Sequence, residues 1–192
     1  MMRIITGSAK GVRLNTLEGD ATRPTAERVK EAVFSMLQFD IEGRKVLDLF
    51  AGSGQMSLEA LSRGASSATL IDKSADAIKI IEDNAKKSKL YDSCVIRRCD
   101  YLDYLKRNKS EKFDIIFLDP PYALHFYAPA LRALIDNDML KPTSLIVCES
   151  GETEIFDGDA MLENSFSIFK QSKYSKTFIT ILTPKSLEEN NE

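Results

Sequence analysis

The sequence holds few of the residues that build metal sites or disulfide scaffolds. Three of its 192 residues are cysteines and one, His125, is a histidine. Cys94, Cys99 and Cys148 form no Cys-x-x-Cys pair, and each lies in or near an apolar, strand-like run. Such positions favour small buried residues with free thiols. We therefore expect no metal site and no disulfide, and we interpret His125 as a loop or surface residue.

Long apolar runs are also missing. No stretch approaches the ~20 apolar residues that a membrane-spanning helix needs. The first residues, MMRIITGSAKG, lack the apolar segment and the cleavage site of a signal peptide. The chain has no internal repeats and no linker, and its composition is 43% hydrophobic and 29% charged. These features predict one cytoplasmic domain with its own core and no membrane partner.

The overall charge is small, at −3, but it is unevenly distributed. Residues 1–30 contain six basic and three acidic side chains, a local charge of +3, which leaves −6 for the remainder. A basic segment on an acidic body suits a polyanion that docks at one end of the protein. Solvated surface charges are the alternative, and charge alone does not decide between the two.

Strand-like and helix-like segments alternate along the chain. Short β-type runs around Gly7 and Gly11 predict a hairpin-like arm, and Pro24 stands where a helix could begin. Further helices are expected from the glycine turn to about Arg63, after Ser74 as a cap, near 101–107 and near 128–135. Strands are expected at 45–50, 68–72, 94–99, 113–119, 144–150, 165–170 and 176–182.

This order predicts an α/β fold with a doubly wound, seven-stranded sheet. Strands rich in Ile, Leu and Val that alternate with helices indicate parallel strands covered on both faces. The last two strands must be antiparallel, because the connection at 171–176 is too short for a parallel crossover. We divide the chain into an arm at 1–22, an α/β domain at 23–184 and a polar tail at 185–192.

The first strand ends in a glycine turn, Val46-Leu47-Asp48-Leu49-Phe50-Ala51-Gly52-Ser53-Gly54. Ligands bind beyond the carboxyl ends of strands in such a sheet, and glycine lets the backbone approach them closely. Asp48 would repel a pyrophosphate but suits the amino group and sulfonium of S-adenosylmethionine. Ser57 also stands where a dinucleotide fingerprint has its third glycine. The turn favours S-adenosylmethionine over a dinucleotide.

Two further carboxylates follow the next strands. Asp72 ends the second strand. It lies ~20 residues beyond the glycine turn, which is the spacing typical of a carboxylate that binds a ribose. Asp100 follows the third strand and could accept a hydrogen bond from an adenine amino group. An ordinary helix N-cap is the alternative for each of them.

The fourth strand ends with Asp119, Pro120, Pro121 and Tyr122. Two prolines enforce a rigid turn that leaves the Pro120 carbonyl free to accept. Asp119 and this carbonyl can bind the two protons of an exocyclic base amine and direct its lone pair at a methyl group. Tyr122 can stack on the base. The alternative is that these residues only form a turn that ends the strand. The position of the motif on the fourth strand, after a glycine turn on the first, favours a catalytic role.

Nearly the whole chain resembles the RsmD-type ribosomal RNA methyltransferases, which methylate N2 of a guanine in bacterial small-subunit RNA. The resemblance rests on RIITGSAKG, RPTAERVKEAVF, VLDLFAGSGQMSLEALSRGA, FLDPPY and KYSKTFITIL. It implies S-adenosylmethionine as the cofactor, a methyltransferase domain at 23–184 and an RNA-docking arm at 1–22. Ser57 and Ser175 depart from the family, which usually has glycine near both positions.

The resemblance also implies site residues. The implied cofactor-binding residues are Asp48, Phe50, Ala51, Gly52, Ser53, Gly54, Asp72, Lys73, Asp100, Tyr101 and, as a weaker assignment, Thr25. The target guanine would be held by Asp119, Pro120, Pro121 and Tyr122. The implied RNA-binding residues are Arg3, Lys10, Arg13, Arg23, Arg28, Lys173 and Lys176. We expect a monomer acting on ribosomal RNA, within a small-subunit particle.

Four alternatives compete with this interpretation. A DNA adenine-N6 methyltransferase shares the DPPY motif but usually has a separate target-recognition region, for which this chain has no room. A release-factor glutamine methylase typically has Asn at position 119. A ribosome-assembly protein with a vestigial fold would have lost Asp48, Asp119 or a glycine of the loop. A dinucleotide-dependent reductase has no use for DPPY.

Overall fold

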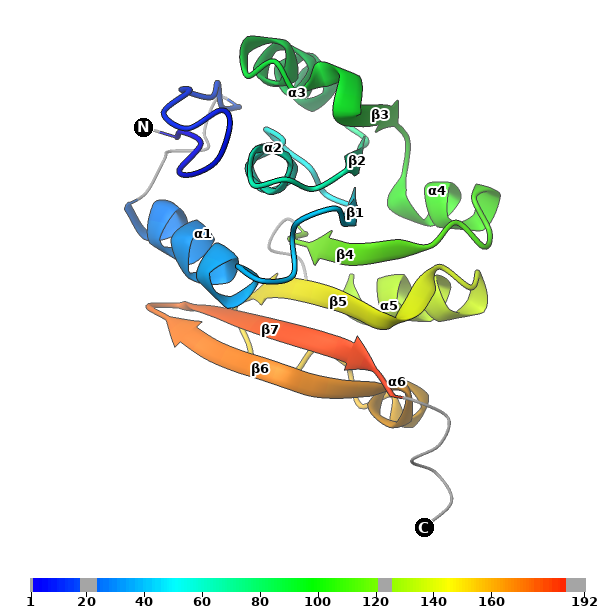
Figure 1. Ribbon diagram of the computed structural model, residues 1–192. Coiled ribbons are helices and arrows are strands. Elements are labelled where there is room, and N and C mark those ends of the chain that lie inside the picture. Colours follow the sequence, from blue (N-terminus) through cyan, green and yellow to red (C-terminus); the bar gives the residue numbers. More distant parts are fainter. Residues whose placement is uncertain (1, 18–23, 121–125, 186–192) are drawn as a thin grey trace.

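The computed structural model describes residues 2–17, 24–120 and 126–185. Its centre is a seven-stranded sheet with the order β3-β2-β1-β4-β5-β7-β6 (Figure 1). The strands are β1 (Lys45–Asp48), β2 (Ser67–Asp72), β3 (Cys94–Arg98), β4 (Phe113–Leu118), β5 (Leu140–Ser150), β6 (Phe166–Tyr174) and β7 (Thr177–Pro184). Strands β1 to β5 pair in parallel, and β7 is antiparallel to both β5 and β6. The expected fold class is thereby confirmed.

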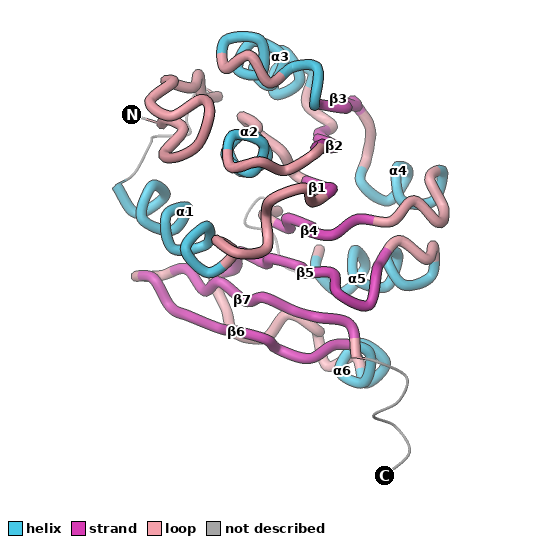
Figure 2. Tube along the Cα trace, in the orientation of Figure 1, coloured by secondary structure: helices cyan, strands magenta, loops and turns pink. Residues whose placement is uncertain are grey.

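Helices cover both faces of the sheet (Figure 2). They are α1 (Pro24–Met36), α2 (Gln55–Ser62), α3 (Ala75–Lys87), α4 (Tyr101–Arg107), α5 (Tyr127–Asp136) and α6 (Ala160–Ser165), with a 3-10 turn at Tyr91–Ser93. One core cluster joins the sheet to α1, α2, α3 and the N-terminal segment. A second cluster joins the opposite face to α4, α5 and α6. Among the described residues, no helix is long and apolar enough to cross a membrane.

From Ile115 onward, after a register shift in its pairing with β5, β4 alternates between these two clusters. In β4, Ile115 and Phe117 belong to the first cluster, while Ile116 and Leu118 belong to the second. The period-2 pattern arises because successive side chains of a strand point to opposite faces. Every residue of β4 is buried, as expected of a central parallel strand covered on both sides.

The N-terminal segment lies beside α2 (Figure 1) and packs into the first core cluster. Ile4, Ala9 and Leu14 are buried, so this segment shares the core of the domain. The expected hairpin is reduced to one antiparallel bridge between Arg3 and Arg13. Its turns bring the backbone of Gly7, at φ 88°, so close to α2 that a Cβ atom would lie 1.7 Å from the Ser62 carbonyl oxygen. Only glycine fits there.

Several element bounds differ from the sequence-based expectation. The connection expected at 171–176 is strand up to Tyr174, so only Ser175 and Lys176 form the turn. Ser175 has φ 60°, in the left-handed region that glycine adopts most easily. The fifth strand begins at Leu140 instead of 144, and α6 was not expected. The three cysteines have free thiols, as predicted.

Candidate active site

The glycine turn between β1 and α2 is held in place by backbone and carboxylate contacts. Gly52 and Gly54 have φ values of 54° and 77°, which explains why glycine stands at both positions. The Gly52 amide donates to Oδ2 of Asp72 at 2.9 Å, and the Ala51 amide donates to the Ile71 carbonyl at 3.0 Å. The turn is therefore pinned to the carboxyl end of β2.

Asp48 is buried at the end of β1, with 3% of its surface exposed. The Ser57 hydroxyl of α2 donates to its Oδ2 at 2.9 Å. The pKa of Asp48 is raised to about 7, chiefly by burial and in small part by the Asp72 carboxylate, although hydrogen bonds from the Ser57 hydroxyl and the Phe50 amide act to lower it. A buried carboxylate with so little compensation is stabilised by a cationic partner. The Ser57 hydroxyl thus supports the predicted cofactor carboxylate.

Asp72 and Asp100 occupy the positions expected for them and also perform local structural roles. The two oxygens of Asp72 accept hydrogen bonds from the amides of Gly52 and Ser74, the latter at 2.8 Å. Asp100 caps α4 by accepting from the Leu102 amide at 2.9 Å. Each carboxylate has more acceptor positions than these bonds use. Lys73, which follows Asp72 in the chain, is exposed.

An aromatic cluster lies beside the glycine turn. The ring of Phe50 is 4.9 Å from that of Tyr101 and 5.7 Å from that of Phe126, and the last two rings are 5.9 Å apart. Phe50 and Tyr101 were predicted to contact the cofactor, whereas Phe126 was missed. No sequence signal identifies Phe126, because the fold alone brings the start of α5 next to α4. Phe50 and Phe126 are half-buried and keep apolar ring surface for a flat ligand, while Tyr101 is buried and supports them.

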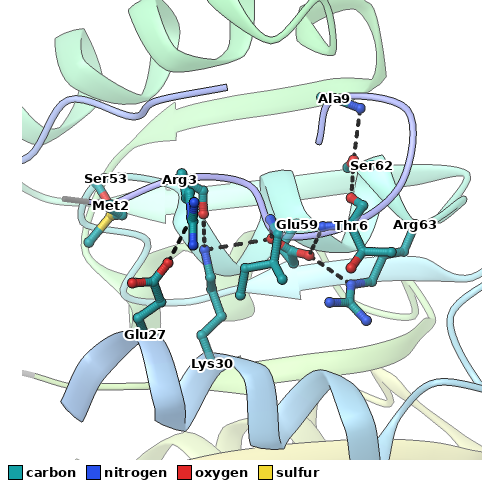
Figure 3. A network of polar contacts seen from close by, with 11 residues as sticks. Met2, Arg3, Thr6, Ala9, Glu27, Lys30, Ser53, Glu59, Ser62 and Arg63 are labelled. Carbon is teal, nitrogen blue, oxygen red and sulfur yellow. Dashed lines mark hydrogen bonds and ion pairs between the residues drawn. The ribbon is translucent and has the colours of Figure 1, made fainter. Parts of the chain in front are cut away.

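The N-terminal segment contacts the glycine turn directly. The Ser53 hydroxyl donates to the sulfur of Met2 at 3.3 Å, and both residues are drawn in Figure 3. The side-chain amide of Asn84 donates to the carbonyls of Ser53 at 2.9 Å and Asn15 at 3.0 Å. Asn84 is fully buried and thus ties the segment, the turn and α3 together. Met2 and Asn84 have no recognisable motif and were not predicted.

The end of β4 places the remaining predicted catalytic residues. Asp119 is exposed and Pro120 is buried directly after the strand. Strand β1 lies between β2 and β4 in the sheet. Asp48 and Asp72 end β1 and β2, and Asp119 directly follows β4, so the three carboxylates lie at the carboxyl ends of neighbouring strands. Pro121 and Tyr122 lie outside the described residues, as do His125 and Arg23. Thr25 lies in α1, but its side chain is outside the description.

The predicted RNA-binding side chains are spread over three elements. The described members of this set, all of them exposed, are Arg3, Lys10, Arg13, Arg28, Lys173 and Lys176. Arg3 forms an ion pair with Glu27 at 3.0 Å, and the glutamate offsets part of the positive potential that Arg3 would present to RNA. The Lys173 ammonium lies 5.0 Å from the centre of the Phe178 ring.

A basic depression that sequence reasoning missed lies at the β3 edge of the sheet. It has a volume of about 320 Å³ and is lined by residues of β3 and α4. Three of the lining residues, Arg97, Arg98 and Arg107, are exposed arginines, and Asp103 is the acidic member. Within the described part of the chain, none of these arginines forms an ion pair. The consecutive arginines of β3, Arg97 and Arg98, were the sequence feature that could have indicated this depression.

Comparisons with known proteins identify the family. The family model described as conserved hypothetical protein 95 matches residues 2–183. The chain is 35% identical to ribosomal RNA small subunit methyltransferase D of Haemophilus influenzae, over 78% of each chain. It is 32% identical to the Escherichia coli protein of the same name, over 88% of this chain and 83% of the relative.

Solved structures agree in fold. The structure of yhhF from Escherichia coli superposes with a TM-score of 0.82 and 27% identity, covering 96% of this chain and 98% of that one. A second structure, SMU.776 complexed with SAH, has a TM-score of 0.68 at 17% identity, over 83% of this chain and 49% of that chain, and shows the fold alone. The chain therefore belongs to the conserved hypothetical protein 95 family, the family of the ribosomal RNA small subunit methyltransferases D, and it is a methyltransferase.

Proposed function

We propose that this protein transfers a methyl group from S-adenosylmethionine to the exocyclic N2 of a guanine in small-subunit ribosomal RNA. The observation that carries the proposal is one shared sheet edge. At this edge the buried carboxylate of Asp48, which precedes the glycine turn, ends the strand next to the one that Asp119 and Pro120 follow. The names of the family members supply the ribosomal RNA substrate.

The residues present fit this cofactor. The Asp48 carboxylate is suited to the cofactor's amino group, because burial leaves it in need of a cationic partner. Asp72 is suited to the ribose hydroxyls, since it ends β2 beside the glycine turn that it also holds. The half-buried ring of Phe50 is suited to the adenine and is supported by the buried ring of Tyr101. When bound, S-adenosylmethionine supplies an electrophilic methyl group.

The acceptor nitrogen is prepared by Asp119 and Pro120. An exocyclic amine is a poor nucleophile because its lone pair is delocalised into the ring. The Asp119 carboxylate and the Pro120 carbonyl would each accept one of its hydrogens and favour a tetrahedral nitrogen whose lone pair is available. The nitrogen–carbon bond forms as the sulfur–carbon bond breaks, and Asp119 accepts the proton released from the nitrogen. Tyr122 would stack on the base.

The basic surfaces are proposed to dock the RNA. Lys10 and Arg13 of the arm, together with Arg28 and the β6–β7 turn, would contact phosphates, as would the depression lined by Arg97 and Arg107. Phosphate contacts would position the RNA, while the base site would select the nucleotide. We further propose that the protein acts as a cytoplasmic monomer on a small-subunit particle.

Asp119→Ala tests the proposal. This variant should bind S-adenosylmethionine with unchanged affinity in calorimetry but lose methyl transfer to unmodified small subunits by at least ~100-fold, the usual range for removing an acid–base group. Asp136→Ala, at the exposed end of α5, is the matched control and should retain wild-type turnover. Wild-type turnover in Asp119→Ala would remove Asp119 from the mechanism.

A further inference from the structure

A second carboxylate lies next to Asp119 at the edge of the sheet. Strands β4 and β5 pair in parallel, and the last aligned pair is Leu118 with Cys148. The residues that follow are Asp119 and Glu149. Strand β5 continues past this point, since Glu149 still pairs with Ile179 of β7. Neighbouring strands are ~4.8 Å apart, so the two acidic residues start from adjacent backbone positions.

The two side chains also start from the same face. Phe117 and Val147 pack into the first core cluster, while Leu118 and Cys148 pack into the second. The next residue of each strand returns to the face of the first cluster, because side chains alternate along a strand. Asp48 and Asp72 follow the same rule in β1 and β2, where Val46 and Leu70 belong to the first cluster. Glu149 therefore shares its face with the proposed cofactor and target sites.

The environment of Glu149 is unusual for a carboxylate. Its side chain is partly buried, and desolvation raises its pKa above the ordinary value. The Tyr127 hydroxyl donates to its backbone carbonyl and so fixes the end of β5. Among the described residues, no hydrogen-bond donor reaches the carboxylate itself. A partly desolvated acceptor in this position gains free energy when a ligand provides a donor.

We infer that Glu149 is the specificity-determining residue that accepts a hydrogen bond from N1–H of the target guanine. This inference rests on the proposed function. In guanine the N1–H group is next to the N2 amine, so a base whose amine lies on Asp119 and Pro120 presents N1–H toward the adjacent strand. Adenine has an acceptor at N1, which a carboxylate repels. Glu149 therefore selects guanine while Asp119 and Pro120 engage the reacting nitrogen.

An RNA substrate with a replaced target base separates this role from a structural one. The analogue 2,6-diaminopurine keeps the 2-amino group but has an acceptor at N1. The wild-type protein should methylate guanine with a kcat/KM roughly 10- to 100-fold higher than that for the analogue, the range for leaving a buried polar group unsatisfied. In Glu149→Gln, the amide can accept from guanine or donate to the analogue, so the ratio should fall to within about threefold of unity.

The controls make each outcome decisive. Glu152→Gln changes an exposed glutamate just beyond β5 and should keep the wild-type ratio. Cofactor affinity measured by calorimetry should be the same in all three proteins, which confirms that the variants are folded. If the wild-type protein methylates guanine and Glu149→Gln keeps the wild-type ratio, the role of Glu149 is refuted and the proposed function stands. If the wild-type protein methylates no guanine in RNA, both are refuted.

Discussion

Replacing Glu59 by glutamine should lower the free energy of unfolding by about 3–5 kcal/mol, the cost of breaking a buried ion pair by removing one partner. Glu59 is fully buried on α2 and accepts hydrogen bonds from the amides of Ile5 at 2.7 Å and Thr6 at 3.0 Å. Its carboxylate also pairs with Lys30 at 3.6 Å and Arg63 at 2.8 Å (Figure 3). This carboxylate therefore joins the N-terminal arm to α1 and α2, alongside the hydrogen bonds that Ser62 and Lys30 make to the arm.

The structure limits the size of this effect. Lys30 is 2% exposed, and burial lowers its pKa, while Glu59 raises it. Without Glu59, Lys30 can release its proton instead of remaining a buried unpaired charge. From an ordinary pKa of ~10.4, this release costs at most about 5 kcal/mol at pH 7. The exposed pair Lys79–Asp76 is the matched control, and Asp76→Asn should change stability by less than ~1 kcal/mol.

Urea denaturation of Glu59→Gln, Lys30→Met and the double variant measures the effect. Lys30→Met should cost less free energy of unfolding in the Glu59→Gln background than in the wild type, because it removes the lysine that Glu59→Gln leaves unpaired. The coupling free energy between the two substitutions should therefore exceed ~1 kcal/mol. Hydrogen exchange should show faster exchange at the Ile5 and Thr6 amides of Glu59→Gln. A loss below ~1 kcal/mol with both amides still protected would refute the view that this carboxylate holds the arm.

Two further predictions concern charge. Because burial raises the pKa of Asp48 to about 7 in the folded protein, its contribution to stability is present below the unfolded pKa of ~3.9 and is lost as the pH rises through about 7. Asp48→Asn should therefore stabilise the cofactor-free protein at pH 8 by about 2–4 kcal/mol in urea denaturation. In calorimetry, the wild-type protein should bind the cofactor more weakly below pH 7, and Asp48→Asn should lack this pH dependence. A pH-independent wild-type affinity would exclude an ionised Asp48 as ligand. Charge reversal of Arg97, Arg98 and Arg107 should weaken RNA binding and lower the slope of log affinity against log salt by about one unit per lost phosphate contact. The control variant Lys79→Glu on α3 should change neither the affinity nor the slope. An unchanged slope in the triple variant would mean that the depression does not dock RNA.

The sequence was sufficient for the sheet and for the residues at its edge. Apolar runs separated by helical segments predict the five parallel strands, because each run must be buried on both faces. The glycine turn was located correctly, since its backbone requirements limit the residues that can occur there. Asp119 and Pro120 directly follow the fourth strand, where the sequence placed them. Ser74 caps α3 as predicted, accepting from the Ala77 amide at 3.3 Å.

The contacts between distant segments could not be predicted. Glu59 reads as a surface residue of an amphipathic helix, and only the packed arm explains its burial. The arm itself resembled a hairpin, but Ile4 and Leu14 gain more from the core than from strand pairing. The approach of Asn84 to Ser53 likewise depends on tertiary packing that no local pattern encodes.

Transfer of labelled methyl from S-adenosylmethionine tests the central claim most directly. The acceptors would be unmodified small ribosomal subunits, naked small-subunit RNA and duplex DNA, with the products digested to nucleosides. We predict N2-methylguanosine from ribosomal substrate alone, and its loss in Asp119→Ala. Label in adenine of DNA would keep the chemistry but contradict the assigned substrate, and no label from any acceptor despite measurable cofactor binding would contradict the claim that this protein methylates ribosomal RNA.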